Sequence, residues 1–161
     1  MPLTTIGIAH QIVSSVKTYK VEKLGSVNDC KLVVNHLIRK FSEPLSKSDK
    51  HKVYRSKSAF HPEKTLKEHL LPVNEIMNHL IEMDFTRNHL ELALEIERYL
   101  TEALVIVVIT DRENQKLNAC GLQKNMPLSY RDPKSTLYAD PWARYKHVEI
   151  YLEIEIPENN I

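Results

Sequence analysis

The hydrophobic pattern of the chain changes its period once, and this change limits the possible fold class. Over roughly the first hundred residues, apolar side chains recur at spacings of three and four, which is typical of helices with one buried face. From Ala103 to Ile109 the pattern becomes a continuous run rich in β-branched residues, which indicates a strand buried on both faces. We therefore expect an α+β fold in which N-terminal helices pack on a small C-terminal β-sheet.

The first half of the chain predicts four helices. One covers residues 8–21 and is followed by Gly25. A capping box of Ser26 and Asp29 opens the next, which should end at Pro44. Pro72 is expected to be the first residue of the third helix, and the fourth should cover residues 87–101. Residues 45–62 predict a short helix or an ordered loop. The apolar faces of the second and fourth helices are predicted to carry Val27, Cys30, Val33, Val34, Leu37, Ile38 and Phe41, and Leu90, Ala93, Leu94 and Leu100.

The second half predicts a smaller, mixed arrangement. Thr110 and Glu113 form a capping box for a short helix, a long loop covers residues 123–140, and Asp140-Pro141 opens a single helical turn. Residues 148–156 alternate between apolar and mostly acidic residues, which predicts a strand. The 103–109 and 147–156 strands should share one sheet, and their pairing as direct neighbours is one arrangement that the pattern allows. With no linker in the sequence, we expect a single domain over residues 1–161.

Composition excludes several classes of protein. The net charge is +1, from 22 basic and 21 acidic residues, so nothing attracts the whole chain to a membrane or to nucleic acid. No run approaches the roughly twenty apolar residues of a membrane span. Cys30 and Cys120 cannot form a disulfide framework, which favours a cytoplasmic setting. Three glycines are too few for a phosphate-cradling loop.

Charge is nevertheless unevenly distributed. The segment from His36 to Lys67 is mostly basic, whereas Glu75 to Glu102 is mostly acidic. Aromatic residues lie near the basic side chains, and this combination is typical of phosphate contact. The candidate nucleic-acid-binding residues are Lys47, Lys50, Lys52, Arg55 and Lys57. The alternative is a solvated surface, or a face complementary to an acidic partner subunit.

One motif points to catalysis. Glu68 and His69 are followed by two apolar residues and Pro72, and this run resembles the first motif of HNH-type (ββα-metal) nucleases. The resemblance implies that His69 is the general base for an attacking water. It also implies that Glu68 ligates a divalent metal such as Mg²⁺ or Mn²⁺, and that a ligating Asn or His lies on a helix after a two-stranded ribbon. The alternative interpretation is a capping box of Thr65 and Glu68, with no metal and a surface or half-buried His69.

A wider resemblance covers roughly residues 65–150. Glu68, His69 and Pro72, the run from Ile109 to Glu113, Met126-Pro127, and Asp140 to Tyr145 resemble a pattern in small uncharacterised bacterial and prophage proteins. It implies a phage or mobile-element setting, and no mechanism. The polar residues expected to meet in one site are Glu68, His69, Glu113, Arg144 and Tyr145. The alternative is that Glu113 only caps its helix, and that Arg144 holds the long loop by bonding carbonyls or pairing with an acid of the final strand.

Two classes of function follow from these patterns. The first is a small interaction protein without catalysis, which binds a protein or nucleic-acid partner or self-associates as a homodimer. Segregated charge blocks and an acidic strand with a free edge favour it. The alternative is a metal-dependent, HNH-like nuclease that uses Glu68 and His69. No cofactor is expected apart from the divalent metal of that alternative.

Overall fold

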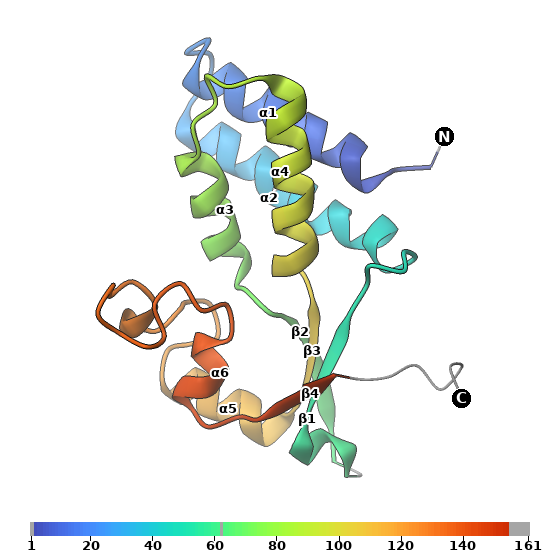
Figure 1. The fold of residues 1–161 in the computed structure, drawn as a ribbon, viewed down its shortest axis with the longest axis vertical. Coiled ribbons are helices and arrows are strands. Elements are labelled where there is room, and N and C mark those ends of the chain that lie inside the picture. The colour runs from blue at the N-terminus through green and yellow to red at the C-terminus, as the bar shows by residue number, and fades with distance from the viewer. Residues whose placement is uncertain (1, 62, 155–161) are drawn as a thin grey trace. The chain divides into compact units, whose positions relative to one another are not determined.

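A computed structural model describes residues 2–61 and 63–154 of the chain (Figure 1). It contains helices together with a four-stranded sheet, so the predicted α+β class is confirmed. The chain forms two compact units. The helical unit comprises the residues up to His51 and Val73–Glu102, and the sheet unit comprises Lys52–Pro72 and the residues from Ala103 onward. Whether they act as one domain, as the sequence predicts, stays a prediction.

The helical unit contains α1 (Thr5–Lys20), α2 (Val27–Leu45), α3 (Val73–Glu82) and α4 (His89–Ala103). Thr4 caps α1 by accepting a hydrogen bond from the Gly7 amide at 3.1 Å. The predicted capping box of α2 is present, because Ser26 and Asp29 each bond the other's backbone amide. No helix in the described ranges is long and apolar enough to span a membrane.

Apolar side chains from all four helices are buried in this unit. They include Ile8, Ile12 and Val16 of α1, Val34, Ile38 and Phe41 of α2, Ile76 and Leu80 of α3, and Leu92, Ile96 and Leu100 of α4. The ammonium group of Lys20 donates to the carbonyl oxygens of Ile81 (2.7 Å) and Met83 (2.9 Å), which ties the end of α1 to the end of α3. The helical period of the sequence thus gives each helix a buried face, although Val27 and Val33, which were predicted on the apolar face of α2, are exposed.

The sheet unit is built on β1 (Val53–Ser56), β2 (Thr65–His69), β3 (Ile106–Thr110) and β4 (Leu152–Ile154). The strand order is β2-β3-β1-β4, with β1 parallel to β3 and the two outer strands antiparallel to their neighbours. Shorter elements complete the unit: η1 (Lys57–Phe60), α5 (Asp111–Ala119), η2 (Leu128–Tyr130) and α6 (Ala143–His147).

One face of this sheet is covered by α5 and α6. Val107 and Ile109 of β3 share a buried cluster with Leu117 of α5 and Tyr145 of α6. Leu70, just beyond β2, belongs to the same cluster and Leu66 of β2 packs against it. Because successive side chains of a strand alternate between faces, Glu68 lies on this covered face as well.

The polar segment before Pro72 differs from its prediction. Residues 45–62 contain β1 and η1 in place of a single helix or loop. Thr65 and Glu68 do not form a capping box, since both belong to β2, which pairs with β3 from Thr65↔Thr110 to His69↔Ile106. A Thr and a Glu three residues apart occur in capping boxes and also in many strands. Here the hydrogen bonds between β2 and β3 fix the segment as a strand.

Two helix predictions also need correction. Pro44 does not stop α2, which continues to Leu45 with the proline in its last turn. In α4, Leu90 and Leu94 are more than half exposed, whereas Leu92, Ala93, Ile96 and Leu100 are buried. The buried stripe of α4 is therefore rotated from the predicted one, because Leu92 and Ile96 lie on the same face as Leu100.

The final strand is shorter than predicted in the part of the chain that the structure describes. Glu149 has a left-handed backbone (φ 57°), and the amides of Val148 and Ile150 both bond to the Tyr145 carbonyl. This turn breaks the extended run, so β4 begins at Leu152, and residues 155 and 156 lie outside the described residues. β3 and β4 share the sheet as expected but are not neighbours, because β1 lies between them.

Candidate functional site

Arg144 of α6 organises a buried cluster beside the end of β2. Its side chain is almost completely buried and its Nη2 lies 3.1 Å from the Glu68 carboxylate. The guanidinium also donates to four carbonyl oxygens, those of His69, Leu70 (3.2 Å), Leu122 (3.2 Å) and Gln123 (3.1 Å). The five N–H groups of an arginine fit this role, since they form a rigid, permanently charged set of donors.

Tyr145 extends the cluster. Its hydroxyl accepts a hydrogen bond from Arg144 at 2.7 Å and donates to the His69 carbonyl at 3.4 Å. Burial raises the pKa of the Tyr145 phenol, so it stays protonated at neutral pH. Burial also raises the pKa of the Glu68 carboxyl group, and the charge and hydrogen bond of Arg144 oppose this effect.

The structure brings together three of the five predicted side chains. Glu68, Arg144 and Tyr145 meet through their side chains, whereas His69 contributes its backbone carbonyl. Strand alternation turns the His69 imidazole to the opposite face of the sheet from Glu68. Glu113 is not part of this contact group, because its described hydrogen bonds go to Ser56 and Thr110. Its predicted role as the capping acid of its helix is confirmed.

The alternative interpretation of Arg144 also agrees with these contacts. Leu122 and Gln123 stand at the start of the long loop, which Arg144 holds through their carbonyls, as that interpretation predicted. The acid that pairs with Arg144 is Glu68 of β2 and not a residue of the final strand. The cluster therefore stabilises the unit whatever else it does.

The HNH resemblance implies a two-stranded ribbon followed by a helix with a ligating Asn or His, and the elements around Glu68 and His69 can be compared with it. β2 ends at His69 and pairs antiparallel with β3, which runs directly into α5. The two strands are not a simple hairpin, because α3 and α4 lie between them in the sequence. On α5, the side-chain oxygen of Asn114 is buried and has no hydrogen-bond partner within the described residues. Sequence reasoning missed Asn114, although its place on a short helix directly after a buried strand was a usable signal.

Three residues show how α5 is turned toward the sheet. Leu117 joins the buried cluster on the sheet, and Glu113 reaches Ser56 of β1. At about 100° per residue, Glu113 and Asn114 lie on opposite sides of the direction in which Leu117 points. Glu113 is turned toward β1, and Asn114 points to the other side of α5. Glu68 lies on the sheet face that α5 and α6 cover, and the buried Asn114 oxygen belongs to one of these two covering helices.

The donor set at this place suits one kind of metal. No group of three or more His, Cys, Asp or Glu side chains that could hold a metal ion occurs among the residues that the structure describes. Glu68 and Asn114 offer a carboxylate and an amide oxygen. Mg²⁺ typically binds through one or two carboxylates, retained waters and substrate phosphates, and not through a complete protein cage. The residues therefore fit a hard, weakly caged cation that the substrate helps to hold.

The five candidate nucleic-acid-binding residues are spread along the chain. Lys47 and Lys50 lie after α2 in the helical unit, and Lys52 comes directly before β1. Arg55 of β1 is partly buried and donates to the Ala59 carbonyl at 3.2 Å. Lys57 is exposed at the start of η1 and lies 3.5 Å from Glu153. Arg55 therefore has a local structural partner, whereas Lys57 lines a pocket.

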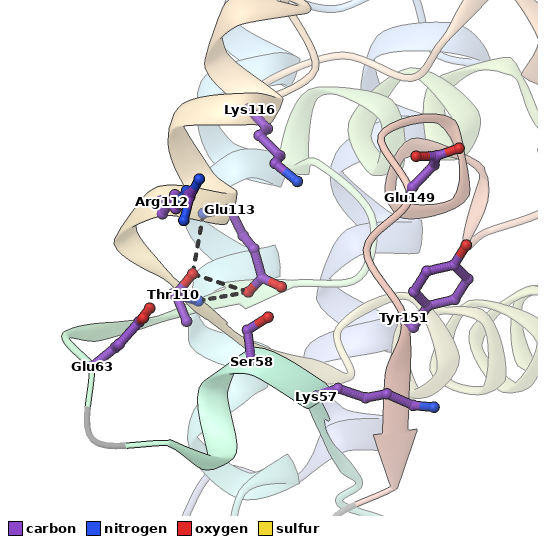
Figure 2. Close-up of a pocket in the computed structure, with 9 residues that line it drawn as sticks. All are labelled: Lys57, Ser58, Glu63, Thr110, Arg112, Glu113, Lys116, Glu149 and Tyr151. Atoms are coloured by element: carbon purple, nitrogen blue, oxygen red, sulfur yellow. Dashed lines mark hydrogen bonds between the residues drawn. The ribbon is translucent and has the colours of Figure 1, made fainter.

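That pocket lies where the parallel strands β1 and β3 end (Figure 2). It has a volume of about 310 Å³ and is lined by Lys57, Ser58, Glu63, Thr110, Arg112, Glu113, Lys116, Glu149 and Tyr151. Glu113 is buried, and its Oε2 accepts hydrogen bonds from Ser56 Oγ (2.6 Å), the Thr110 amide (2.9 Å) and Thr110 Oγ1 (3.2 Å). Except for Glu113 and Lys57, none of these pocket residues was a sequence candidate.

Comparison of the chain with protein family models, with curated proteins and with solved structures gives no match.

Proposed function

We propose that this protein is a metal-dependent phosphodiesterase that cleaves nucleic acid at the end of β2. The observation that carries the proposal is the sequence of elements around Glu68 and His69. The strand that ends in this pair is hydrogen-bonded to β3, and β3 leads directly into the helix of Asn114. The side-chain oxygen of Asn114 is buried and has no hydrogen-bond partner among the residues that the structure describes. The HNH resemblance of Glu68, His69 and Pro72 implies this arrangement.

Each residue then has a chemical role. His69 is the last residue of β2, and its imidazole would reach around the strand end to take a proton from the attacking water as general base. Glu68 and Asn114 hold a divalent cation, which when bound would polarise the scissile phosphate. Arg144 is a positioning residue, because it fixes both the His69 carbonyl and the Glu68 carboxylate. Its ion pair uses Oε2 of Glu68, and a carboxylate has a second oxygen with which it can bind a cation.

A cleavage assay tests the proposal. Supercoiled DNA, linear single-stranded DNA and RNA are incubated with the protein in Mg²⁺, Mn²⁺ or EDTA. We expect metal-dependent cleavage that falls at least about 100-fold in His69→Ala, since general-base catalysis contributes factors of this size. Asn114→Ala should raise the metal concentration needed for half-maximal cleavage.

The matched control is His147→Ala, which removes an exposed histidine from α6 and should leave cleavage unchanged. The melting temperature of every variant is measured, so that loss of the fold is not mistaken for loss of the base. Absence of metal-dependent cleavage by the wild type on all three substrates contradicts the proposal.

A second candidate function is binding of a protein partner or of a second copy of the chain. Exposed apolar side chains gather around the turn between α1 and α2, namely Val21, Leu24, Val27, Leu32 and Val33. Leu24 and Val33 also line a pocket of about 400 Å³. Light scattering on the wild type and on a Leu24→Lys, Leu32→Lys variant tests this candidate. A monomeric wild type that captures no partner contradicts it. The resemblance to bacterial and prophage proteins suggests a cytoplasmic, mobile-element setting for either candidate.

A further inference from the structure

The pocket of Figure 2 occupies the position at which open sheets with parallel strands usually bind ligands. Ser56 ends β1 and Thr110 ends β3, and because these strands are parallel, both ends lie at the same edge of the sheet. After them the chain diverges into η1 and α5, which leaves a crevice at the carboxyl ends of the strands. Like the Glu68 cluster, the pocket lies in the sheet unit, but it is lined by other residues.

Glu113 offers a fixed acceptor in this pocket. The described hydrogen bonds to its carboxylate all go to Oε2, from Ser56 and Thr110. Its other oxygen, Oε1, points into the space between Ser58 and Lys116 (Figure 2). A carboxylate that is already held in place can accept a hydrogen bond from a ligand hydroxyl without ordering itself first.

The charges around Glu113 favour a ligand that carries both hydrogen-bond donors and a negative charge. Lys116 points into the pocket and forms no ion pair with the described residues, and Arg112 lines the same space. Glu63 and Glu149 lie on the wall as well, so the pocket is not a simple anion trap. A ligand with a phosphate and a nearby hydroxyl group matches this mixture of charges. The side chains of Lys116 and Arg112 would bind the phosphate, and the Glu113 carboxylate would accept a hydrogen bond from the hydroxyl.

An aromatic pocket adjoins the first one. It has a volume of about 440 Å³, and its wall includes Tyr54, Trp142, Tyr145 and Tyr151. The rings of Tyr54 and Trp142 meet edge to face with their centroids 4.7 Å apart. Lys57 and Tyr151 line both pockets, so the two spaces are neighbours on either side of these residues. Tyr151 is exposed, Tyr54 and Trp142 are half-buried, and Tyr145 is buried. Accessible aromatic rings beside basic side chains are typical of sites on which nucleobases stack.

We propose that the two pockets form one groove that binds a phosphorylated ribonucleoside as part of a single-stranded RNA. The base lies in the aromatic pocket, the ribose 2′-hydroxyl donates to Glu113 Oε1, and the phosphate lies by Lys116 and Arg112. The 2′-hydroxyl is the group by which proteins distinguish RNA from DNA. The inference names RNA as the substrate class of the proposed phosphodiesterase and in that respect rests on it.

Binding is measured in EDTA, so that the result does not depend on cleavage. The probes are a short labelled single-stranded RNA, the DNA of the same sequence, and the RNA with 2′-O-methyl groups. We expect RNA to bind at least about tenfold more tightly than the other two, since a hydrogen bond to a charged group is worth this much. Glu113→Gln should abolish this preference and leave DNA binding nearly unchanged.

Tyr151→Ala tests the aromatic half of the groove. Tyr151 is 67% exposed, so its loss should not disturb the fold. We expect about 5-fold or greater weakening for RNA and DNA alike, as for other stacked bases. The control is Tyr138→Ala, which removes an exposed tyrosine that lines neither pocket. Competition by adenosine monophosphate as strong as that by the RNA would identify a free nucleotide as the source of the same chemistry.

The failure of this inference differs from the failure of the proposed function. Equal affinity for RNA and DNA, or an RNA preference that survives Glu113→Gln, overturns the groove even if metal-dependent cleavage is observed. RNA-selective binding without cleavage supports the groove and contradicts the phosphodiesterase.

Discussion

Two buried glutamates of the sheet unit are stabilised in different ways. Glu68 faces the guanidinium of Arg144, which at the same time serves several backbone carbonyls. Glu113 faces no described cation at ion-pair distance and is held by two hydroxyls and an amide. A buried charge needs compensation, and either a full charge or a set of dipoles can supply it.

Because their charges are compensated in different ways, the two sites should respond differently to mutation. Arg144 of α6 bonds both to the end of β2 and to the loop that follows α5. Its loss would therefore leave hydrogen-bond acceptors without donors in several segments. Ser56 and Thr110 act on one carboxylate at one strand edge, so the loss of either is local. Variants at the two sites can show whether this difference is real.

The largest effect is expected at Arg144. Arg144→Leu leaves the Glu68 carboxylate buried without its cation and removes the donors of four carbonyls, which should cost about 3–5 kcal/mol of stability. Urea denaturation measures this change. Glu68→Gln should cost much less, because Arg144 keeps its carbonyl partners. If the two variants were equally destabilised, the ion pair and not the carbonyl network would dominate the cluster.

A smaller effect is expected at Ser56. Its hydroxyl donates to Glu113 at 2.6 Å and accepts from the Ala59 amide at 3.1 Å. Ser56→Ala removes both bonds in a buried place and should cost about 1–3 kcal/mol. Thermal denaturation checks it, with Ser58→Ala as the matched control from the exposed start of η1. If Ser56→Ala left the stability unchanged, the amide and hydroxyl of Thr110 would be sufficient to stabilise the buried Glu113 carboxylate.

The smallest effect concerns pH. Burial raises the pKa of Glu68 in the folded state, so between the unfolded and folded pKa values the folded protein binds the extra proton. The stability that this carboxyl group contributes is therefore complete at low pH and is lost as pH rises through the folded pKa. The stability difference between wild type and Glu68→Gln should shift toward the wild type as pH falls. A difference that does not change with pH, or that shifts the other way, contradicts the assignment.

The sequence predicted those features that depend on neighbouring residues. The helical period of α1 and α2 and the boxes of Ser26 with Asp29 and of Thr110 with Glu113 are local, and the structure confirms them. β1 and β2 were missed because both strands are short and most of their residues are polar. Their strand character comes from pairing with β3, which is distant in the sequence.

The site was predictable only in part for the same reason. Glu68, Arg144 and Tyr145 were expected to meet, and they do. The carbonyls that Arg144 binds could not be read from the sequence, since every residue has one and only the fold selects them. Glu113 was assigned to the same site because it is one of the polar residues in the wider resemblance over residues 65–150. In the structure Glu113 lies at the strand ends, where Ser56 of β1 donates a hydrogen bond to it. No local sequence pattern indicates that Ser56 is its partner.

The chain leaves the sheet unit after β2 and re-enters it at β3, and its exit and entry points lie side by side. The Leu71 amide bonds to the Ala103 carbonyl at 3.2 Å, and the Leu70 amide bonds to the Val105 carbonyl at 2.9 Å. Backbone atoms this close can be bridged by a tight turn of a few residues. Residues 73–102 are thus attached like a domain inserted into a hairpin. A shortened gene that starts at Lys52 and joins the two strands directly is the natural route to the sheet unit as an independent protein.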